Sequence, residues 1–434
     1  MSSRILSLTL VYGLAVSSLS AANWTGWRGD NGLGISPERK VPLKWSATEN
    51  VLWKIELPEA GNSTPVVWKD KVFITQAVGE RRTVMCFDRK SAKLLWQNGT
   101  SYNEKEESHE TNPYCSSSPV TDGERVIAWF GSAGVFCYDL TGKQLWRASP
   151  GKQEHMWGYA SSPFIHDNLC ILYFGPGNSG ALVALNKKTG SEVWRVKDPP
   201  VQQRPRTDGF RGQERTGVIC SFSSPILLAP EGRAPSSPQL IMTYPQLVRG
   251  YDPNTGKELW TCDGLNELLY TSPIAGDGIV VAMGGFNGST IAVKADGKGD
   301  VTATHRLWRQ ERTKNRLGSG VVHEGHVYIL NTEGIAECIE LKTGKIVWQE
   351  RVKGGATSES WSSMVLAADR LYVLNRSGAT VVLKASPKFE LLAVNPLDGA
   401  LTNASHAISD GEIFIRTHKH LWRIAEATET AFLK

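Results

Sequence analysis

The sequence Tyr251-Asp252-Pro253-Asn254-Thr255-Gly256-Lys257-Glu258-Leu259-Trp260 is typical of a β-hairpin. The side chain of Asp252 can accept a hydrogen bond from the backbone two residues on, which starts a turn. Gly256 can adopt the positive φ that the turn requires, and Leu259-Trp260 then begins a second strand. This motif therefore predicts two antiparallel strands joined by a tight turn.

The chain repeats this hairpin motif. Copies lie at 138–146, 185–194 and 339–348, and a looser copy lies at 87–96. The spacing is roughly 40 to 65 residues, the range expected of repeat architectures in which each unit is one supersecondary element. The fold must therefore be interpreted as a set of stacked repeats.

The composition agrees with many short strands and turns. The 434 residues include 15 Trp, 42 Gly and 21 Pro, and 41% of the residues are hydrophobic. The formal net charge of +5 is too small over this length to indicate a nucleic-acid partner. We expect one all-β body that acts as a monomer.

The N-terminus predicts export from the cytoplasm. Residues 1–22 contain Arg4, an apolar run at 5–19 and the small residues Ser20-Ala21-Ala22, as in a secretory signal peptide. A retained anchor is the alternative, although the run is short for a membrane span. We expect a periplasmic or secreted protein without an integral span in the mature chain.

An arm and a single large domain follow the signal. The arm, residues 23–44, is rich in Gly and carries Trp24 and Trp27, which either pin it to the body or contact a sugar or another ligand. Eight units then open with small residues, such as Ser117-Ser118-Pro119, and each unit has room for four strands. The last unit has room for only three, and residues 51–55 can supply its fourth strand. The sequence thus predicts one eight-bladed β-propeller over residues 45–434, closed by an N-terminal strand.

Seven cysteines in an exported chain raise the question of disulfides. Cys86, Cys137 and Cys338 each precede the acidic residue of the hairpin motif by two positions, where other copies have Ala184 or Gly250. Equivalent slots in different blades lie too far apart for a disulfide. We expect these three thiols to be free and buried, whereas the state of Cys115 and Cys220 stays open.

The repeats resemble the PQQ-like β-propeller repeats of bacterial quinoprotein alcohol dehydrogenases and of the outer-membrane β-barrel assembly lipoprotein. The similarity rests on Asp139–Trp146, Asp252–Trp260 and Glu340–Trp348 and extends over residues 53–424. Three further phrases resemble exported bacterial PQQ-like propeller proteins, at 27–32, 299–305 and 415–417. The resemblance implies that the tryptophan ending each motif packs between neighbouring blades, which assigns a structural role to Trp53, Trp96, Trp146, Trp194, Trp260, Trp308 and Trp348.

The resemblance specifies the fold better than the activity. The dehydrogenases carry two adjacent cysteines against the cofactor, and no two cysteines are adjacent in this sequence. Their Ca²⁺ ligands and catalytic Asp cannot be placed here by motif. We therefore expect no cofactor and a binding or scaffolding module of the bacterial cell envelope, with a protein or carbohydrate partner. A PQQ-dependent oxidoreductase with Ca²⁺, acting on alcohols or sugars, is the alternative.

The candidate binding residues lie in the long connections between units, which gather on one face of a propeller. This rim combines aromatic and polar side chains, as ligand sites do. The alternative is a structural role, in which the aromatic side chains fill the mouth of the propeller and the histidines form hydrogen bonds with backbone carbonyls. No metal site is expected, because metal-ligand spacing is absent. The predicted rim consists of His109, Asn112, Tyr114, His155, Trp157, Tyr159, Arg211, Arg215, Trp361 and His406.

Overall fold

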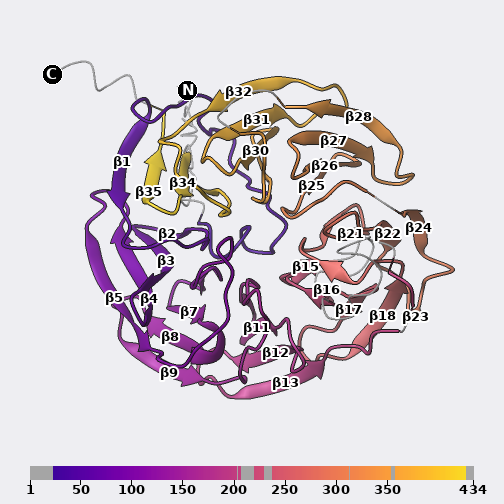
Figure 1. Ribbon diagram of the computed structural model, residues 1–434, viewed down its shortest axis with the longest axis horizontal. Helices are drawn as coiled ribbons and strands as arrows, with labels where there is room; N and C mark the ends of the chain where they lie inside the picture. Colours follow the sequence, from indigo (N-terminus) through magenta and orange to yellow (C-terminus); the bar gives the residue numbers. More distant parts are fainter. Residues whose placement is uncertain are drawn as a thin grey trace, which may run out of the picture.

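The computed structural model describes residues 23–202, 204–206, 219–228, 237–311, 313–352 and 357–426. The strands form a ring of eight antiparallel sheets, or blades, around a central axis (Figure 1). Seven blades have four strands and the fourth blade has five. The prediction of an all-β, eight-bladed propeller is confirmed. The predicted signal segment, residues 1–22, lies outside the described residues.

Each blade runs from an inner strand at the axis to an outer strand at the rim of the ring. Blades 1 and 2 contain β2 (Val66–Trp68), β3 (Lys71–Val78), β4 (Arg81–Asp88) and β5 (Leu94–Ser101), then β6 (Val120–Thr121), β7 (Arg125–Trp129), β8 (Val135–Asp139) and β9 (Gln144–Ala148). Blades 3 and 4 contain β10 (Phe164–His166), β11 (Leu169–Phe174), β12 (Ala181–Asn186) and β13 (Glu192–Lys197), then β15 (Ile226–Leu228), β16 (Gln239–Tyr244), β17 (Leu247–Tyr251) and β18 (Glu258–Asp263).

The second half of the ring repeats this order. Blades 5 and 6 contain β20 (Ile274–Gly276), β21 (Ile279–Met283), β22 (Thr290–Lys294) and β24 (Arg306–Gln310), then β25 (Val321–His323), β26 (His326–Leu330), β27 (Ile335–Glu340) and β28 (Ile346–Arg351). Blades 7 and 8 contain β29 (Val365–Ala367), β30 (Arg370–Leu374), β31 (Thr380–Lys384) and β32 (Leu391–Asn395), then β33 (Ala407–Ser409), β34 (Glu412–Arg416), β35 (His420–Ile424) and β1 (Val51–Glu56).

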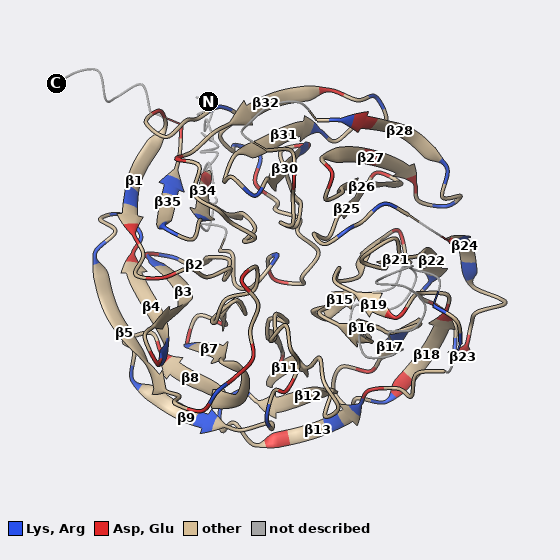
Figure 2. Ribbon diagram, viewed as in Figure 1, with Lys and Arg blue, Asp and Glu red and all other residues tan. Residues whose placement is uncertain are grey.

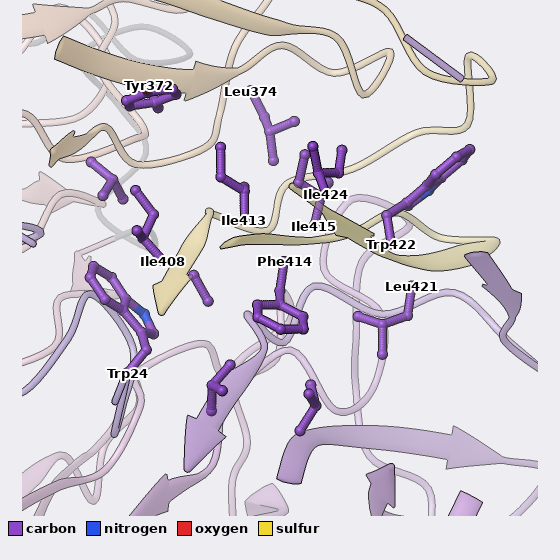
Figure 3. Close-up of a cluster of buried hydrophobic side chains, with 14 of the residues drawn as sticks. Trp24, Tyr372, Leu374, Ile408, Ile413, Phe414, Ile415, Leu421, Trp422 and Ile424 are labelled. Atoms are coloured by element: carbon purple, nitrogen blue, oxygen red, sulfur yellow. The ribbon is translucent and has the colours of Figure 1, made fainter. Parts of the chain in front are cut away.

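Blade 8 is assembled from both ends of the described chain. Strand β1 pairs antiparallel with β35, from Val51 opposite Ile424 to Glu56 opposite His420. A large apolar cluster lies beside this junction, and Figure 3 shows its side chains from β33, β34 and β35, with Trp24 of the arm near Ile408 of β33. The N-terminal strand therefore occupies the outer position of the last blade.

The blades are joined at the axis by an inner ring of hydroxyl groups. In each blade the residue two positions before the inner strand accepts a hydrogen bond from the backbone N–H of the same position in the preceding blade, at 2.8–3.0 Å. The bonds close on themselves through all eight blades. The members of this inner ring are Thr64, Ser118, Ser162, Ser224, Ser272, Ser319, Ser363 and Ser405.

An outer ring of tryptophans joins the blades farther from the axis. Six of them donate an indole N–H to a backbone carbonyl in the turn of the next blade, at 2.8–3.2 Å. These are Trp53, Trp96, Trp146, Trp194, Trp308 and Trp348. Opposite Trp96, Trp146 and Trp348 in their own blades stand Cys86, Cys137 and Cys338. Small residues are required there because the indole lies over that slot.

The joint between blades 4 and 5 is built differently. Trp260 is fully buried and donates its indole N–H to Gln239 in its own blade, at 2.7 Å. A Cβ at Gly250 would lie 2.3 Å from the indole nitrogen, so only glycine permits this placement. The short strand β23 (Gly299–Asp300), from blade 5, pairs in parallel with β18 and covers the tryptophan. Trp260 thus packs between blades without the carbonyl bond of the other six.

At the joint between blades 7 and 8 the blade tryptophan is missing. Ala393 occupies the equivalent position, and the larger Val382 stands opposite it. Trp45, which precedes β1, fills the space and stacks on Tyr372 with ring centroids 6.4 Å apart. Its backbone N–H also donates to the side chain of Asn395 at 3.1 Å. The chain therefore supplies the missing aromatic group from a segment distant in sequence.

The arm crosses the face of the ring opposite the long connections. Trp24 forms a β-bridge with Val67 of blade 1, and Asn31 accepts a backbone hydrogen bond from Leu227 of blade 4. Arg28 is fully buried and donates to the carbonyl of Gly320 at 2.6 Å. Its burial without a carboxylate lowers the pKa of the guanidinium to about 9. This segment closes one end of the axial channel.

All seven cysteines are free and buried, including Cys115 and Cys220. The expectation for Cys86, Cys137 and Cys338 is confirmed. Burial raises the pKa of the Cys86 and Cys137 thiols to about 12, so they are protonated and unreactive at neutral pH. Within the described residues, no helix has the length and hydrophobicity of a membrane span.

Candidate functional site

A cavity of about 330 Å³ lies on the axis and is called the cup here. Five members of the inner ring line it, and Trp27 of the arm also contributes to the lining. The connections between blades surround the other end, because they enter the inner strands from that face. The cup is lined by Trp27, Asn62, His109, Thr111, Asn112, Ser116, Trp157, Ala160, Ser162, Phe222, Ser224, Tyr270, Phe286, Leu317, Ser319, Trp361, Ser363, Asn403 and Ser405.

One residue from every blade forms the wall of the cup. It stands two positions before the member of the inner ring, and because extended backbone directs residues i and i+2 to the same side, both face the axis. We call these the wall positions. They are Asn62, Ser116, Ala160, Phe222, Tyr270, Leu317, Trp361 and Asn403, and all eight line the cup.

Aromatic side chains dominate the wall at blades 4 and 5. Phe222 and Tyr270 stack with centroids 5.4 Å apart and an interplanar angle of 3°. Trp157 stacks on both at 6.4 Å, and Phe286 meets Tyr270 edge-on at 5.4 Å. The short parallel pair β14 (Cys220–Ser221) and β19 (Leu268–Leu269) fixes the two connections that carry Phe222 and Tyr270. The aromatic wall is therefore rigidly supported.

Trp361 forms a separate aromatic surface at blade 7. Its indole N–H donates to Glu359 at 2.8 Å, and the guanidinium of Arg376 lies 4.8 Å from the ring centroid. Arg376 and Glu359 are also paired at 3.2 Å. The indole is thus held in one orientation by contacts outside the cup.

A tight turn at 109–112 links its own connection to three other connections at the mouth. The carbonyl of Thr111 accepts hydrogen bonds from the side-chain amides of Asn62 and Asn403, at 3.0 and 2.9 Å. The amide of Asn112 donates to the carbonyls of Trp157 and Tyr159, at 2.7 and 3.1 Å. Four loops are therefore tied together before any ligand binds, which preorganises the mouth.

The lining of the cup carries no permanent charge: none of its described residues is Lys, Arg, Asp or Glu. Figure 2 shows Lys, Arg, Asp and Glu along outer strands such as β9, β13, β18 and β28. Nearby, burial lowers the pKa of His155 to about 4, and burial with the Arg416 charge lowers that of His418 to about 4. These imidazoles are neutral at pH 7.

PQQ and Ca²⁺ do not fit this lining. PQQ carries three carboxylates, which need Arg or Lys partners when they leave water. Ca²⁺ needs several carboxylate or carbonyl oxygens. The described lining supplies neither cations nor carboxylates, and no group of three or more His, Cys, Asp or Glu that could hold a metal occurs among the described residues.

The structure brings four of the predicted rim residues together in the cup, namely His109, Asn112, Trp157 and Trp361. His155 lies just behind them and meets Trp157 and Phe222 edge-on at 5.5 Å. Arg211 and Arg215 lie outside the described residues. Arg204, from the same predicted loop, pairs with Asp263 at 3.2 Å.

The other three predicted rim residues lie elsewhere. His406 is fully buried, bonded to Thr380 at 2.8 Å, because it follows the inner-ring residue and faces away from the axis. Tyr159 is buried against Trp129, with centroids 4.7 Å apart. Tyr114 donates its hydroxyl to the carbonyl of Glu106 and lies under Arg82, outside the cup. The rim prediction was wrong for the buried His406 and Tyr159, whereas Tyr114 lines a separate hollow beside His109 and Glu110.

Sequence reasoning missed most wall positions. Phe222, Tyr270, Asn62 and Asn403 were not proposed, although each stands two residues before the inner-ring residue of a recognised unit opening. The alternation of extended backbone was the available signal, since the Ser-Pro openings fix the register for every blade. Trp27 and Phe286 had no such signal, because they reach the cup from the arm and from a turn.

The family model for outer membrane protein assembly factor BamB matches residues 42–173, 135–224 and 245–428. The chain belongs to this family. The protein named outer membrane protein assembly factor BamB from Burkholderia pseudomallei is 23% identical over 389 residues, covering 78% of this chain and 90% of the relative.

Enzymes with related propellers are also similar. The 1-butanol dehydrogenase (quinone) of Thauera butanivorans is 27% identical over 205 residues, which is 42% of this chain and 30% of the enzyme. The crystal structure of quinohemoprotein alcohol dehydrogenase from Comamonas testosteroni superposes with a TM-score of 0.66 at 11% identity, covering 94% of this chain and 81% of the enzyme. At this identity the superposition shows the fold alone.

Proposed function

We propose that this protein is a non-catalytic binding propeller of the bacterial cell envelope that holds a protein partner on its loop-rich face. The observation that carries the proposal is the preorganised mouth, in which side-chain amides tie three other loops to the turn at 109–112. Rigid loops reduce the entropy lost on association. The family supports the choice of partner, because its members are named as assembly factors for outer membrane proteins.

The exposed groups around the mouth suit a protein partner. Met156 and Leu401, in two of the connections, expose 55% and 49% of their surface. Exposed acidic residues such as Glu107 and Glu110 flank them. A mixed apolar and charged surface on fixed loops is typical of transient protein interfaces.

The alternative function, a PQQ-dependent oxidoreductase, is favoured less. The fold similarity to quinone-dependent enzymes supports it, as do the aromatic rings of the cup. The uncharged lining argues against a site for a tricarboxylate with Ca²⁺. We expect no saturable PQQ binding below about 10 μM, which corresponds to roughly 7 kcal/mol, when the protein is titrated with PQQ and Ca²⁺.

Site-specific crosslinking tests the partner. A photoreactive residue at Glu110, exposed on the loop-rich face, should give one discrete adduct with an envelope protein of the outer-membrane assembly machinery. The same residue at Lys188, exposed in a turn of the opposite face, is the control and should give none. Equal labelling from both positions, or none from Glu110, would contradict the proposal. Tight PQQ binding with reduction of a dye by alcohols would favour the alternative.

A further inference from the structure

The hydroxyl groups of the inner ring have unused hydrogen-bonding capacity. Each accepts one hydrogen bond from a neighbouring blade, and in the described structure none of the eight donates its own hydrogen to a protein acceptor. Five of them line the cup: Ser162, Ser224, Ser319, Ser363 and Ser405. The cup therefore presents a set of neutral O–H donors near the axis.

The mouth offers neutral acceptors. Asn112 and Asn403 use their N–H groups to fix the turn at 109–112, and their amide oxygens accept no hydrogen bond from the described residues. The oxygen of Asn403 is buried without a partner. Buried polar atoms of this kind are costly unless a partner satisfies them. Uncharged hydrogen-bond donors and uncharged acceptors thus occur in the same cavity.

Flat apolar surfaces line the same cavity as these polar groups. Phe222 and Trp361 are wall positions, and Trp27 lines the same cavity; all three remain partly exposed, whereas Trp260 of the outer ring is fully buried. Aromatic faces attract the weakly positive C–H groups of a ligand because the face of the ring is electron-rich. The wall is also asymmetric, with aromatics at blades 4, 5 and 7 and amides at blades 1 and 8.

We propose that the cup binds a neutral carbohydrate. A pyranose has an apolar face of C–H groups and a rim of hydroxyls, each able to donate and accept, which matches a cavity lined by aromatic rings, hydroxyl donors and amide acceptors. A carboxylate or phosphate in the cup would lose its water without gaining a cation among the described lining residues. The volume of about 330 Å³ is at the low end for small-molecule sites and suits one or two sugar rings.

This inference does not rest on the proposed protein partner. The cup lies inside the mouth, whereas the partner surface consists of the exposed loops around it. A protein that binds sugar but fails to crosslink from Glu110 would keep this inference and lose the proposed function. A protein that crosslinks from Glu110 but binds no sugar would keep the proposed function and lose this inference.

The experiment uses the full-length protein after export. A panel of neutral mono- and oligosaccharides, including glucose, N-acetylglucosamine and their β-1,4-linked oligomers, is screened by tryptophan fluorescence and confirmed by calorimetry, with glucuronic acid as the charged comparator. We expect saturable binding of at least one neutral sugar with a Kd below about 1 mM and at least tenfold weaker binding of the uronic acid. Tighter binding of the oligomer than of its monomer would identify a glycan chain as the source rather than a free sugar.

Matched variants locate the binding. Trp361→Ala should weaken the affinity at least tenfold, and Trp361→Phe should recover part of it. Trp68→Ala, which removes a partly buried tryptophan on the opposite face, should leave the affinity unchanged. Thermal melting confirms that each variant is folded. Absence of saturable binding across the neutral panel, preference for the uronic acid, or equal affinity of Trp361→Ala would overturn the inference.

Discussion

The inner ring and the outer ring join the same eight blades, but they tolerate different amounts of variation. At the axis every joint uses a hydroxyl and a backbone N–H at 2.8–3.0 Å, with Thr64 the single substitute for serine. At the periphery six joints use the indole N–H of a blade tryptophan, one uses a buried tryptophan under an added strand, and one uses Trp45 from outside the blade.

The difference follows from the shape of the gap between blades. Near the axis neighbouring backbones are close enough for one short side chain to span them, so the residue type is fixed by distance. Farther out the gap widens into a wedge, which only a large side chain fills, and several routes can deliver one. Close packing is required in both places, but only the outer one accepts substitutes.

The strongest test of this contrast compares two outer-ring tryptophans. Trp260→Ala should lower the free energy of unfolding by about 3–5 kcal/mol, because a fully buried indole leaves a cavity between two blades and under β23. Trp348→Ala should cost roughly 2 kcal/mol, since Trp348 is partly exposed and loses less buried area. Urea denaturation measures both. Equal losses would mean that the added strand contributes nothing to the joint.

The joint between blades 7 and 8 should be acid-sensitive, as should the surroundings of His155 and His418, whose pKa values burial also lowers. Burial lowers the pKa of His406 to about 3, whereas an unfolded histidine titrates near 6.5. The neutral ring therefore contributes its full stability above about pH 6.5, and this contribution is lost as the pH falls toward 3, because the unfolded chain binds the proton first. The loss between pH 7 and pH 5 should be about 2 kcal/mol.

His406→Gln keeps a neutral group near Thr380 and should remove this share of the pH dependence. His326→Gln, at a partly exposed position in blade 6, is the matched control for the histidine-to-glutamine change itself. Denaturation of both variants at pH 7 and at pH 5 gives four free energies of unfolding to compare. An unchanged slope in His406→Gln would show that His406 is protonated in the folded protein.

The sequence predicted the structural features that recur from blade to blade and missed those that occur only once. The hairpin motif predicted five of the outer-ring tryptophans and the small slots of Cys86, Cys137 and Cys338, because one local pattern recurs with fixed register. The family resemblance added Trp53 and Trp308. Trp45 could not be found in this way, since its role depends on the absence of a tryptophan at Ala393. A compensation between distant segments leaves no periodic signal.

The prediction of the candidate site was limited in the same way. His109 and Trp361 were expected at the mouth because they lie in long connections, and they line the cup. His406 was predicted on the same rim as an equivalent of Trp361 in a later blade, but it stands one residue after the inner ring, so its side chain points to the opposite side. Register, rather than nearness in sequence, decides which residues face the axis.

The smallest expected effect tests the inner ring itself. Thr64 is fully buried, and its hydroxyl accepts the backbone N–H of Ser405 at 3.0 Å across the junction between blades 8 and 1. Thr64→Val keeps the shape of the side chain but leaves that N–H without an acceptor, which should cost about 1 kcal/mol. Thr64→Ser restores the hydroxyl found in the other seven blades and should cost less. Hydrogen exchange at the Ser405 amide distinguishes a local from a global effect. If the bond acts only at this junction, the Ser405 amide should lose protection in Thr64→Val, whereas the corresponding amide of Ser224, on the opposite side of the ring, should keep its own bond to Ser272 and its protection. If both amides lose protection equally, the eight bonds act as one cooperative ring, and the strict retention of a hydroxyl at every joint reflects that cooperativity rather than distance alone.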